Sequence, residues 1–275
     1  MRPDLRLQQA LALADSRGAK VTFHSPDFDT AEAERIVVLF GSRPAGVPCP
    51  LAHFACPFGP KHVAVVRVED RHGGYLGFRF LVLHRELYRH LGDPFAISDR
   101  YPVNWFVSGS LPELVWPQEP LPERTVEQLD AVLRDGEGPL LLGGVQAVVD
   151  GNRVLVRRNE PDEKLLRGVW QLLPDGTRAD RWPASFAFSD ELGFHFAALP
   201  ALPSVKHEPR PLTEEAAKDY PPSSYELNLQ IAIESRDGAA LRRLLARRTP
   251  DETIRLGLYM LAFALLMVLV FRFLL

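Results

Sequence analysis

Apolar residues recur along the first half of the chain in both helix-like and strand-like patterns. Residues 4–18 carry leucine and alanine at helical spacing, which predicts a short amphipathic helix. Short runs of Val, Ile, Leu and Phe predict strands, and the tetrapeptide RHGG at 71–74 predicts a hairpin turn between two of them. The strands predicted in this half cover residues 21–24, 36–40, 63–68 and 75–83.

Later segments continue this mixture of helix and strand patterns. The predicted helices cover residues 84–91, 126–133 and 162–173. The strands predicted as two hairpins cover residues 140–149, 153–157, 184–188 and 194–199. Because helices and strands do not alternate regularly, we expect an α+β fold with mixed, mainly antiparallel sheets and short helices.

Proline-rich stretches divide the chain into expected regions. Residues 1–199 form a first α+β region, in which the proline-rich stretch 102–124 marks a candidate sub-boundary. Residues 200–224 contain six prolines and many charges, the composition of a linker arm. Two short helices are predicted beyond this arm, and they would form a helical hairpin over residues 225–248.

The densest apolar block covers residues 256–275, with the sequence LGLYMLAFALLMVLVFRFLL. Twenty helical residues extend about 30 Å, which is the thickness of the hydrocarbon core of a bilayer. A capping box at 249–252 would begin this helix just before the apolar block. The sequence therefore predicts a single C-terminal transmembrane helix over residues 249–275. The alternative is a buried core helix or a helix that binds a partner.

Charges around the apolar block predict its orientation. More arginines precede the block than follow it, and an excess of positive charge favours the cytoplasmic side. The first twenty residues contain no signal-peptide segment. We therefore expect a tail-anchored, single-pass membrane protein with a cytoplasmic N-terminal domain. The side chains expected to contact lipid are Leu256, Tyr259, Leu266, Phe271 and Arg272.

A second set of side chains is expected at the membrane surface. These are Arg242, Arg243, Arg247 and Arg248. They share one side of a predicted helix whose other side carries leucines, an arrangement that suits an anionic lipid surface. The alternative is a solvated arginine face beside a packed leucine stripe.

Composition narrows the class of protein. The 275 residues include 32 basic and 35 acidic side chains, so the formal net charge is −3, and 46% of residues are hydrophobic. These values exclude a wholly disordered chain and a strongly basic nucleic-acid binder. Two cysteines exclude a scaffold held by several disulfides and fit a reducing compartment.

Candidate chemistry is concentrated in the segment PCPLAHFACPFGPKH at 48–62. Its Cys49, His53, Cys56 and His62 are ligand types of tetrahedral zinc, although the spacing C-x3-H-x2-C-x5-H matches no standard finger. One hypothesis is a zinc site formed by these four residues. A second is a hydrolase in which one thiolate attacks with histidine as the base. A third interpretation makes both cysteines small buried hydrophobic residues.

Other motifs of catalysis and cofactor binding are missing from the sequence. There is no P-loop, no dinucleotide-binding glycine motif and no G-x-S-x-G. We therefore expect no cofactor apart from the hypothetical zinc. Whether the protein is an enzyme stays open at this point.

Residues 138–199 contain GGVQAVVDG, interpreted as a strand, then LLRGVWQLLP, interpreted as a helix, and then R-x-x-R-W-P-x-S-F-A-F-S. This order resembles the N-terminal module of bacterial GTPase-associated proteins of conflict systems. In that module, a helix that ends at Leu-Pro precedes a strand with a Ser-Phe core. The resemblance covers about a quarter of the chain and implies a recognition or adaptor role without catalytic residues.

These observations predict a membrane-tethered, non-catalytic binding or adaptor protein. Its expected partners are the lipid bilayer and a protein such as a GTPase, and nucleic acid is not expected. The alternative is a membrane-bound hydrolase or metal-site protein that uses the loop with Cys49, His53, Cys56 and His62.

Overall fold

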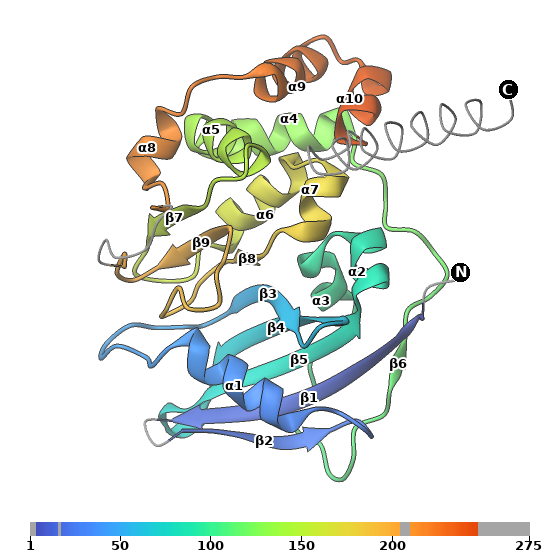
Figure 1. Cartoon of the computed structure of the whole chain (residues 1–275), viewed down its shortest axis with the longest axis vertical. Coiled ribbons are helices and arrows are strands. Elements are labelled where there is room, and N and C mark those ends of the chain that lie inside the picture. The colour runs from blue at the N-terminus through green and yellow to red at the C-terminus, as the bar shows by residue number, and fades with distance from the viewer. Residues whose placement is uncertain (1–3, 16–17, 204–209, 247–275) are drawn as a thin grey trace, which may run out of the picture.

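The computed structural model describes residues 4–15, 18–203 and 210–246. In these residues the chain has an α+β fold, in which short helices surround one mixed sheet of nine strands (Figure 1). The sheet order is β2-β1-β5-β4-β3-β8-β9-β7, and β6 pairs with β1 beside this path. An antiparallel block therefore occupies one end of the sheet, and a parallel block occupies the other.

The antiparallel block contains β1 to β5. Its strands are β1 (Arg6–Asp15), β2 (Gly18–His24), β3 (Ala52–Phe58), β4 (His62–Asp70) and β5 (Leu76–His84). Between β4 and β5 lies the short 3-10 turn η1 (His72–Gly74), so the predicted hairpin is confirmed. The strand β6 (Leu114–Val115) and its neighbours lie along β1, where Trp116 donates its backbone N–H to the Leu5 carbonyl at 2.8 Å.

The helix predicted over residues 4–18 is wrong, because residues 6–15 form strand β1 and Gly18 begins β2. Leucine and alanine favour helix, but β1 lies between β2 and β5 and bonds to both. Its Ala10 and Ala12 are small side chains that are completely buried. Tertiary pairing thus overrides the intrinsic preference of these residues.

Helix α1 (Thr30–Phe40) covers one face of the antiparallel block, where residues 36–40 were predicted as a strand. Asp29 caps the helix by accepting the backbone N–H of Glu32. The buried residues Ala33, Ile36, Val37 and Phe40 follow helical spacing across the whole segment. The β-branched residues 36–38 favoured a strand locally, but the buried positions of the whole segment follow the period of a helix.

The parallel block extends the sheet beyond β3. Its strands are β8 (Pro183–Ala184), β9 (Phe196–Leu199) and β7 (Val154–Arg157). β8 is antiparallel to β3, but β9 runs parallel to β8 and β7 runs parallel to β9. The hairpin predicted from 184–188 and 194–199 is therefore wrong, because the chain leaves β8 and bonds to the end of α1 through Phe188 and Ser189 before it returns.

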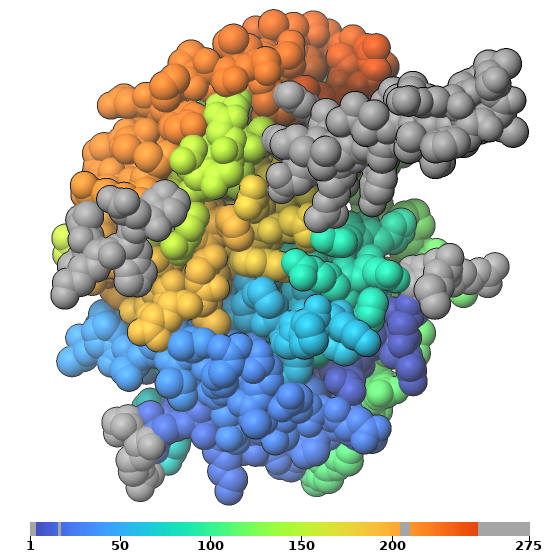
Figure 2. Space-filling model, in the orientation of Figure 1, coloured from blue at the N-terminus to red at the C-terminus, as the bar shows by residue number. Residues whose placement is uncertain are grey.

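The remaining helices lie against both blocks: the first two pack on β3, β4 and β5, and the others lie over the parallel block (Figure 1). They are α2 (Arg85–Leu91), α3 (Pro94–Arg100), α4 (Val126–Asp135), α5 (Gly138–Val149), α6 (Glu163–Leu172), α7 (Asp175–Asp180), α8 (Glu214–Lys218), α9 (Ser224–Glu234) and α10 (Gly238–Leu245). Figure 2 shows the antiparallel block and the C-terminal helices as two zones of one surface. The helices predicted at 84–91, 126–133 and 162–173 are confirmed as α2, α4 and α6.

Helix α5 replaces the strand predicted at 140–149. This segment is apolar on all sides, so its pattern does not distinguish a buried strand from a buried helix. Two glycines permit the close packing of the helix. A Cβ on Gly143 would lie 2.0 Å from the Ala217 carbonyl oxygen of α8, and one on Gly144 would lie 2.7 Å from the ring of Phe196. The helix is therefore held between α8 and β9.

The described part of the proline-rich arm is attached to the sheet. Leu212 bridges to β7, accepting the backbone N–H of Leu155 at 2.9 Å, and α8 lies against α5 with Ala217 buried. The two helices expected at 225–248 are present as α9 and α10.

The membrane predictions are corrected by the helices of the structure. Within residues 4–15, 18–203 and 210–246, no helix has the length and apolar character needed to cross a bilayer. The helix α5, with 12 residues, extends only about 18 Å. The segment 249–275 lies outside the described residues, and so do the lipid-contact residues Leu256, Tyr259, Leu266, Phe271 and Arg272. A tail-anchored, single-pass membrane protein with membrane localisation is therefore not supported.

The interfacial role of the four arginines stays a prediction. Arg247 and Arg248 lie outside the described residues. Arg242 and Arg243 lie on α10, where Arg242 approaches the Glu123 carboxylate at 3.9 Å and Arg243 donates to the Ala239 carbonyl at 3.3 Å. Their guanidinium groups thus have partners within the protein.

Candidate functional site

The structure separates the four side chains of the predicted Cys/His site. His53 and Cys56 lie three residues apart on β3, so they point to opposite faces of the sheet. Cys49 lies beside Asp70 at one end of the β3–β4 hairpin, whereas His62 begins β4 at the other end, roughly 25 Å of strand away. In the described part of the chain, no group of three His, Cys, Asp or Glu could hold a metal ion. These four residues do not form one site.

Burial keeps both thiols protonated. Burial raises the pKa of the Cys49 thiol to about 12, and Asp70 adds to the effect. Burial also raises the pKa of the Cys56 thiol, with Glu32 as the second cause. Because the thiolate is the form that attacks a substrate or binds a metal, the two side chains behave as small buried hydrophobic residues.

His53 belongs instead to a buried polar cluster between β3 and α6. Its side chain is 2% exposed, and its Nδ1 lies 3.3 Å from Oε2 of Glu163. Its backbone N–H donates to Oγ of Ser185 at 2.8 Å, and the Ser185 N–H donates to the His53 carbonyl at the same distance. Burial alone would raise the pKa of Glu163, but His53 and Arg167 lower it to about 2. The cluster holds α6 against the sheet.

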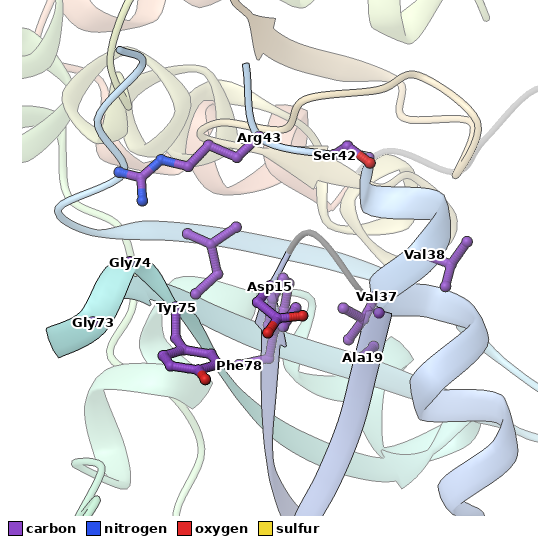
Figure 3. A pocket seen from close by; sticks show the side chains of 14 residues that line it. Asp15, Ala19, Val37, Val38, Ser42, Arg43, Gly73, Gly74, Tyr75 and Phe78 are labelled. Atoms are coloured by element: carbon purple, nitrogen blue, oxygen red, sulfur yellow. The ribbon is translucent and has the colours of Figure 1, made fainter. Parts of the chain in front are cut away.

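A cleft of about 800 Å³ opens where β1 turns into β2 (Figure 3). Its walls come from the adjoining ends of β1 and β2, from the end of α1 with the residues after it, and from the turn before β5. This volume is within the range of pockets that hold small molecules. The cleft is the best candidate for a functional site in the described part of the chain.

The floor of the cleft is apolar. Val37 of α1 and Leu76 and Phe78 of β5 are buried there, and Ala19 of β2 is half-buried. Val38 follows Val37 on α1 and is 66% exposed beside the cleft. A ligand with an apolar part would remove the exposed surface of Val38 and Ala19 from water, which stabilises the complex.

One guanidinium group borders this floor and is held in place. Arg43 pairs through Nη2 with Oδ1 of Asp70 at 2.7 Å, and its Nε–H donates to the Val47 carbonyl at 2.8 Å. The other Asp70 oxygen accepts the backbone N–H of Cys49 at 2.9 Å. A guanidinium carries five N–H donors, so Arg43 has donors left for a ligand after these two bonds.

The opposite wall supplies groups of different chemistry. Figure 3 shows Asp15 and Tyr75 across the cleft from Arg43, and Ser42 beside the end of α1. Their carboxylate and hydroxyl groups can accept or donate hydrogen bonds to a polar part of a ligand. The arrangement is therefore an apolar surface with polar groups on two sides.

Glycine shapes two edges of the cleft. Gly41 ends α1 with φ of 100°, and a Cβ there would lie 2.8 Å from Cβ of Ser189. Gly74 has φ of 82° and faces open space, so a ligand can approach its backbone closely.

Sequence reasoning missed this cleft. Its walls come from segments at 14–15, 18–19, 37–43 and 73–78, and those at 14–15 and 37–40 lie in elements whose type was predicted wrongly. Arg43 and Tyr75 belong to no motif. The glycines near 41 and 73–74 were the available signal, and they predicted turns only.

No known protein-family model matches the chain, and no curated protein proves similar to it. The resemblance of residues 138–199 to GTPase-associated modules and the GTPase partner that it suggests therefore stay predictions. Within that segment, GGVQAVVDG lies mainly in helix α5 rather than in the strand that the resemblance implied.

Proposed function

We propose that the protein binds a small amphipathic molecule that carries a carboxylate or similar oxyanion in the cleft between α1, β2 and β5. The observation that carries this proposal is the apolar floor bordered by one preorganised guanidinium. The apolar part of the ligand would lie against Val38 and Ala19, and its oxyanion would accept N–H groups of Arg43.

Two energetic contributions support this assignment. Each 100 Å² of apolar surface that the ligand buries contributes about 2.5 kcal/mol. A hydrogen bond to a charged donor contributes about 1.5 to 3 kcal/mol and also orients the ligand. Because Asp70 and the Val47 carbonyl already hold Arg43 in place, little side-chain entropy is lost on binding.

The proposal is tested by calorimetric titration of the full chain with decanoate, using 1-decanol as an uncharged match. We expect decanoate to bind more tightly than decanol. Arg43→Gln should weaken decanoate binding at least about tenfold, because it removes the charged donor. The control Arg35→Gln removes an arginine of α1 that pairs with Glu32 outside the cleft, and it should leave binding unchanged.

A second pair of variants tests the position of the ligand. Ala19→Phe would fill the cleft from β2 and should abolish binding, whereas Lys20→Phe places the same ring on the next residue, whose side chain points to the other face. Equal effects of the two variants on a folded protein, or no decanoate binding to the native chain, would refute the proposal.

A further inference from the structure

A row of basic side chains crosses the face of the antiparallel block opposite α1. Arg79 of β5 lies directly across from Arg67 of β4, and Arg67 lies across from His53 of β3. Side chains opposite each other on neighbouring strands are about 5 Å apart at Cβ, where like charges repel. Arg67 and Arg79 are therefore like charges on neighbouring strands, and no residue paired directly with either of them across the sheet is acidic.

Arg79 is buried without a carboxylate partner. It is 4% exposed, and no carboxylate of a described residue lies within 4.0 Å of its guanidinium. Among the described residues its hydrogen-bond acceptor is Gln9, whose Oε1 lies 3.5 Å from Nη2. Burial lowers the pKa of Arg79 to about 10, and Arg67 adds to this effect, so the group still carries its charge at neutral pH.

The neighbouring charges do not compensate for Arg79. Glu69 accepts hydrogen bonds from Arg67 at 2.8 Å and from Arg71 at 3.2 Å. Arg67 and Arg71 thus share one carboxylate, and Arg79 is not among its partners. Arg67 and Arg71 are 31% and 26% exposed, so an anion in solvent can reach them.

An aromatic side chain covers the cluster from the segment after α3. The Cζ atom of Arg71 lies 4.8 Å from the centroid of the Trp105 ring. Both groups lie over Gly77, where a Cβ would be 2.8 Å from each, so they share a face with Arg79 two residues further along β5. The indole N–H of Trp105 is buried and has no acceptor among the described residues. A small pocket of about 240 Å³ adjoins Arg71 and Trp105.

We propose that Arg67, Arg71 and Trp105, beside the buried charge of Arg79, form a binding site for a small oxyanion such as a phosphate group. The anion would neutralise the excess charge, and phosphate has enough acceptor atoms for several guanidinium N–H groups. None of the three arginines lines the cleft that contains Arg43. The failure of this proposal would therefore leave the proposed function of the cleft untouched.

The test is thermal unfolding of the full chain in inorganic phosphate and in chloride at equal ionic strength, with phosphate kept below about 10 mM to limit general salt effects. We expect a saturable rise of Tm with phosphate, because a ligand of the native state stabilises it by mass action. Arg79→Met should remove the rise while keeping or raising the Tm in chloride, because it removes an uncompensated buried charge.

Two further variants keep the outcome decisive. Arg89→Met removes an arginine that pairs with Asp180 at 2.9 Å away from this face, and it should leave the phosphate response intact. Arg67→Gln changes a half-buried residue that tolerates substitution better than Arg79, and it should weaken the phosphate response several-fold. Equal Tm in phosphate and chloride, or a full response in Arg79→Met and Arg67→Gln, would overturn the proposal.

Discussion

In the C-terminal half the buried Arg178 and the half-buried Arg158 have carboxylate partners, whereas the buried Arg79 of the antiparallel block has none among the described residues. Arg178 of α7 pairs with Asp93 at 2.7 Å and donates to the Gly92 carbonyl at 3.0 Å. Arg158 pairs with Asp162 at 2.8 Å. A buried charge is tolerated when it is paired and hydrogen-bonded. The paired arginines therefore join elements of the fold, and the uncompensated one indicates a site for an external anion.

The glycines of α5 and those at the cleft also differ, in the space that a Cβ would have. Gly143 and Gly144 of α5 are packed so closely that a Cβ would collide with α8 or β9. At the cleft, Gly18 and Gly74 have open space where a Cβ would stand. Gly143 and Gly144 thus serve internal packing, whereas Gly18 and Gly74 leave backbone accessible to a ligand beside the cleft.

The largest expected effect is that of Gly143→Ala, which tests the packing of α5. Its Cβ would lie 2.0 Å from the backbone oxygen of Ala217, so α8 must move, and we expect a loss of more than about 3 kcal/mol of unfolding free energy in urea. Gly138→Ala in the same helix is the control, because the nearest atom to its Cβ is 3.8 Å away. An equal effect of both variants would refute this account of the two glycine classes.

The comparison of arginines predicts opposite signs for one substitution at two positions. Arg178→Met leaves Asp93 without its buried partner and should cost about 3 kcal/mol of unfolding free energy. Arg79→Met in chloride should cost nothing or should stabilise the protein, because no carboxylate is left unpaired. Chemical denaturation of both variants measures the difference. A similar loss in both would mean that Arg79 is also a structural residue.

A smaller effect is expected from pH through His195 in the C-terminal half. Its Nδ1 accepts the backbone N–H of Trp182 at 3.0 Å, and burial, followed by Arg181, lowers its pKa to about 3. Because the folded state disfavours the protonated ring, its contribution to stability is complete above pH 6.5 and is lost as the pH falls toward 3. Between pH 6.5 and 5 we expect a loss of at most about 2 kcal/mol.

Unfolding measured in urea across this pH range tests the role of His195. His195→Asn retains an acceptor for the Trp182 N–H but has no group that titrates there, so it should flatten the pH dependence. An unchanged slope in His195→Asn would assign the acid sensitivity to other residues.

Several elements were predictable because their signals are local. The helices α2, α4 and α6 have apolar residues at helical spacing and a clear capping residue or a terminal glycine. The strands β4 and β5 contain dense runs of Val, Leu and Phe around a glycine-rich turn. In each case the intrinsic preference of the residues agrees with the tertiary environment.

Tertiary structure decided the elements and sites for which local signals were ambiguous. Residues 6–15 form β1 because two strands pair with them, and 138–149 form α5 because α8 and β9 enclose them. His53 and Cys56 point to opposite faces of the sheet because they lie on a strand, and the spacing alone did not reveal that strand. The cleft and the arginine cluster join residues distant in sequence, and such proximity follows only from long-range strand pairing. The chain itself thus determined its short elements, and the sheet determined which side chains meet.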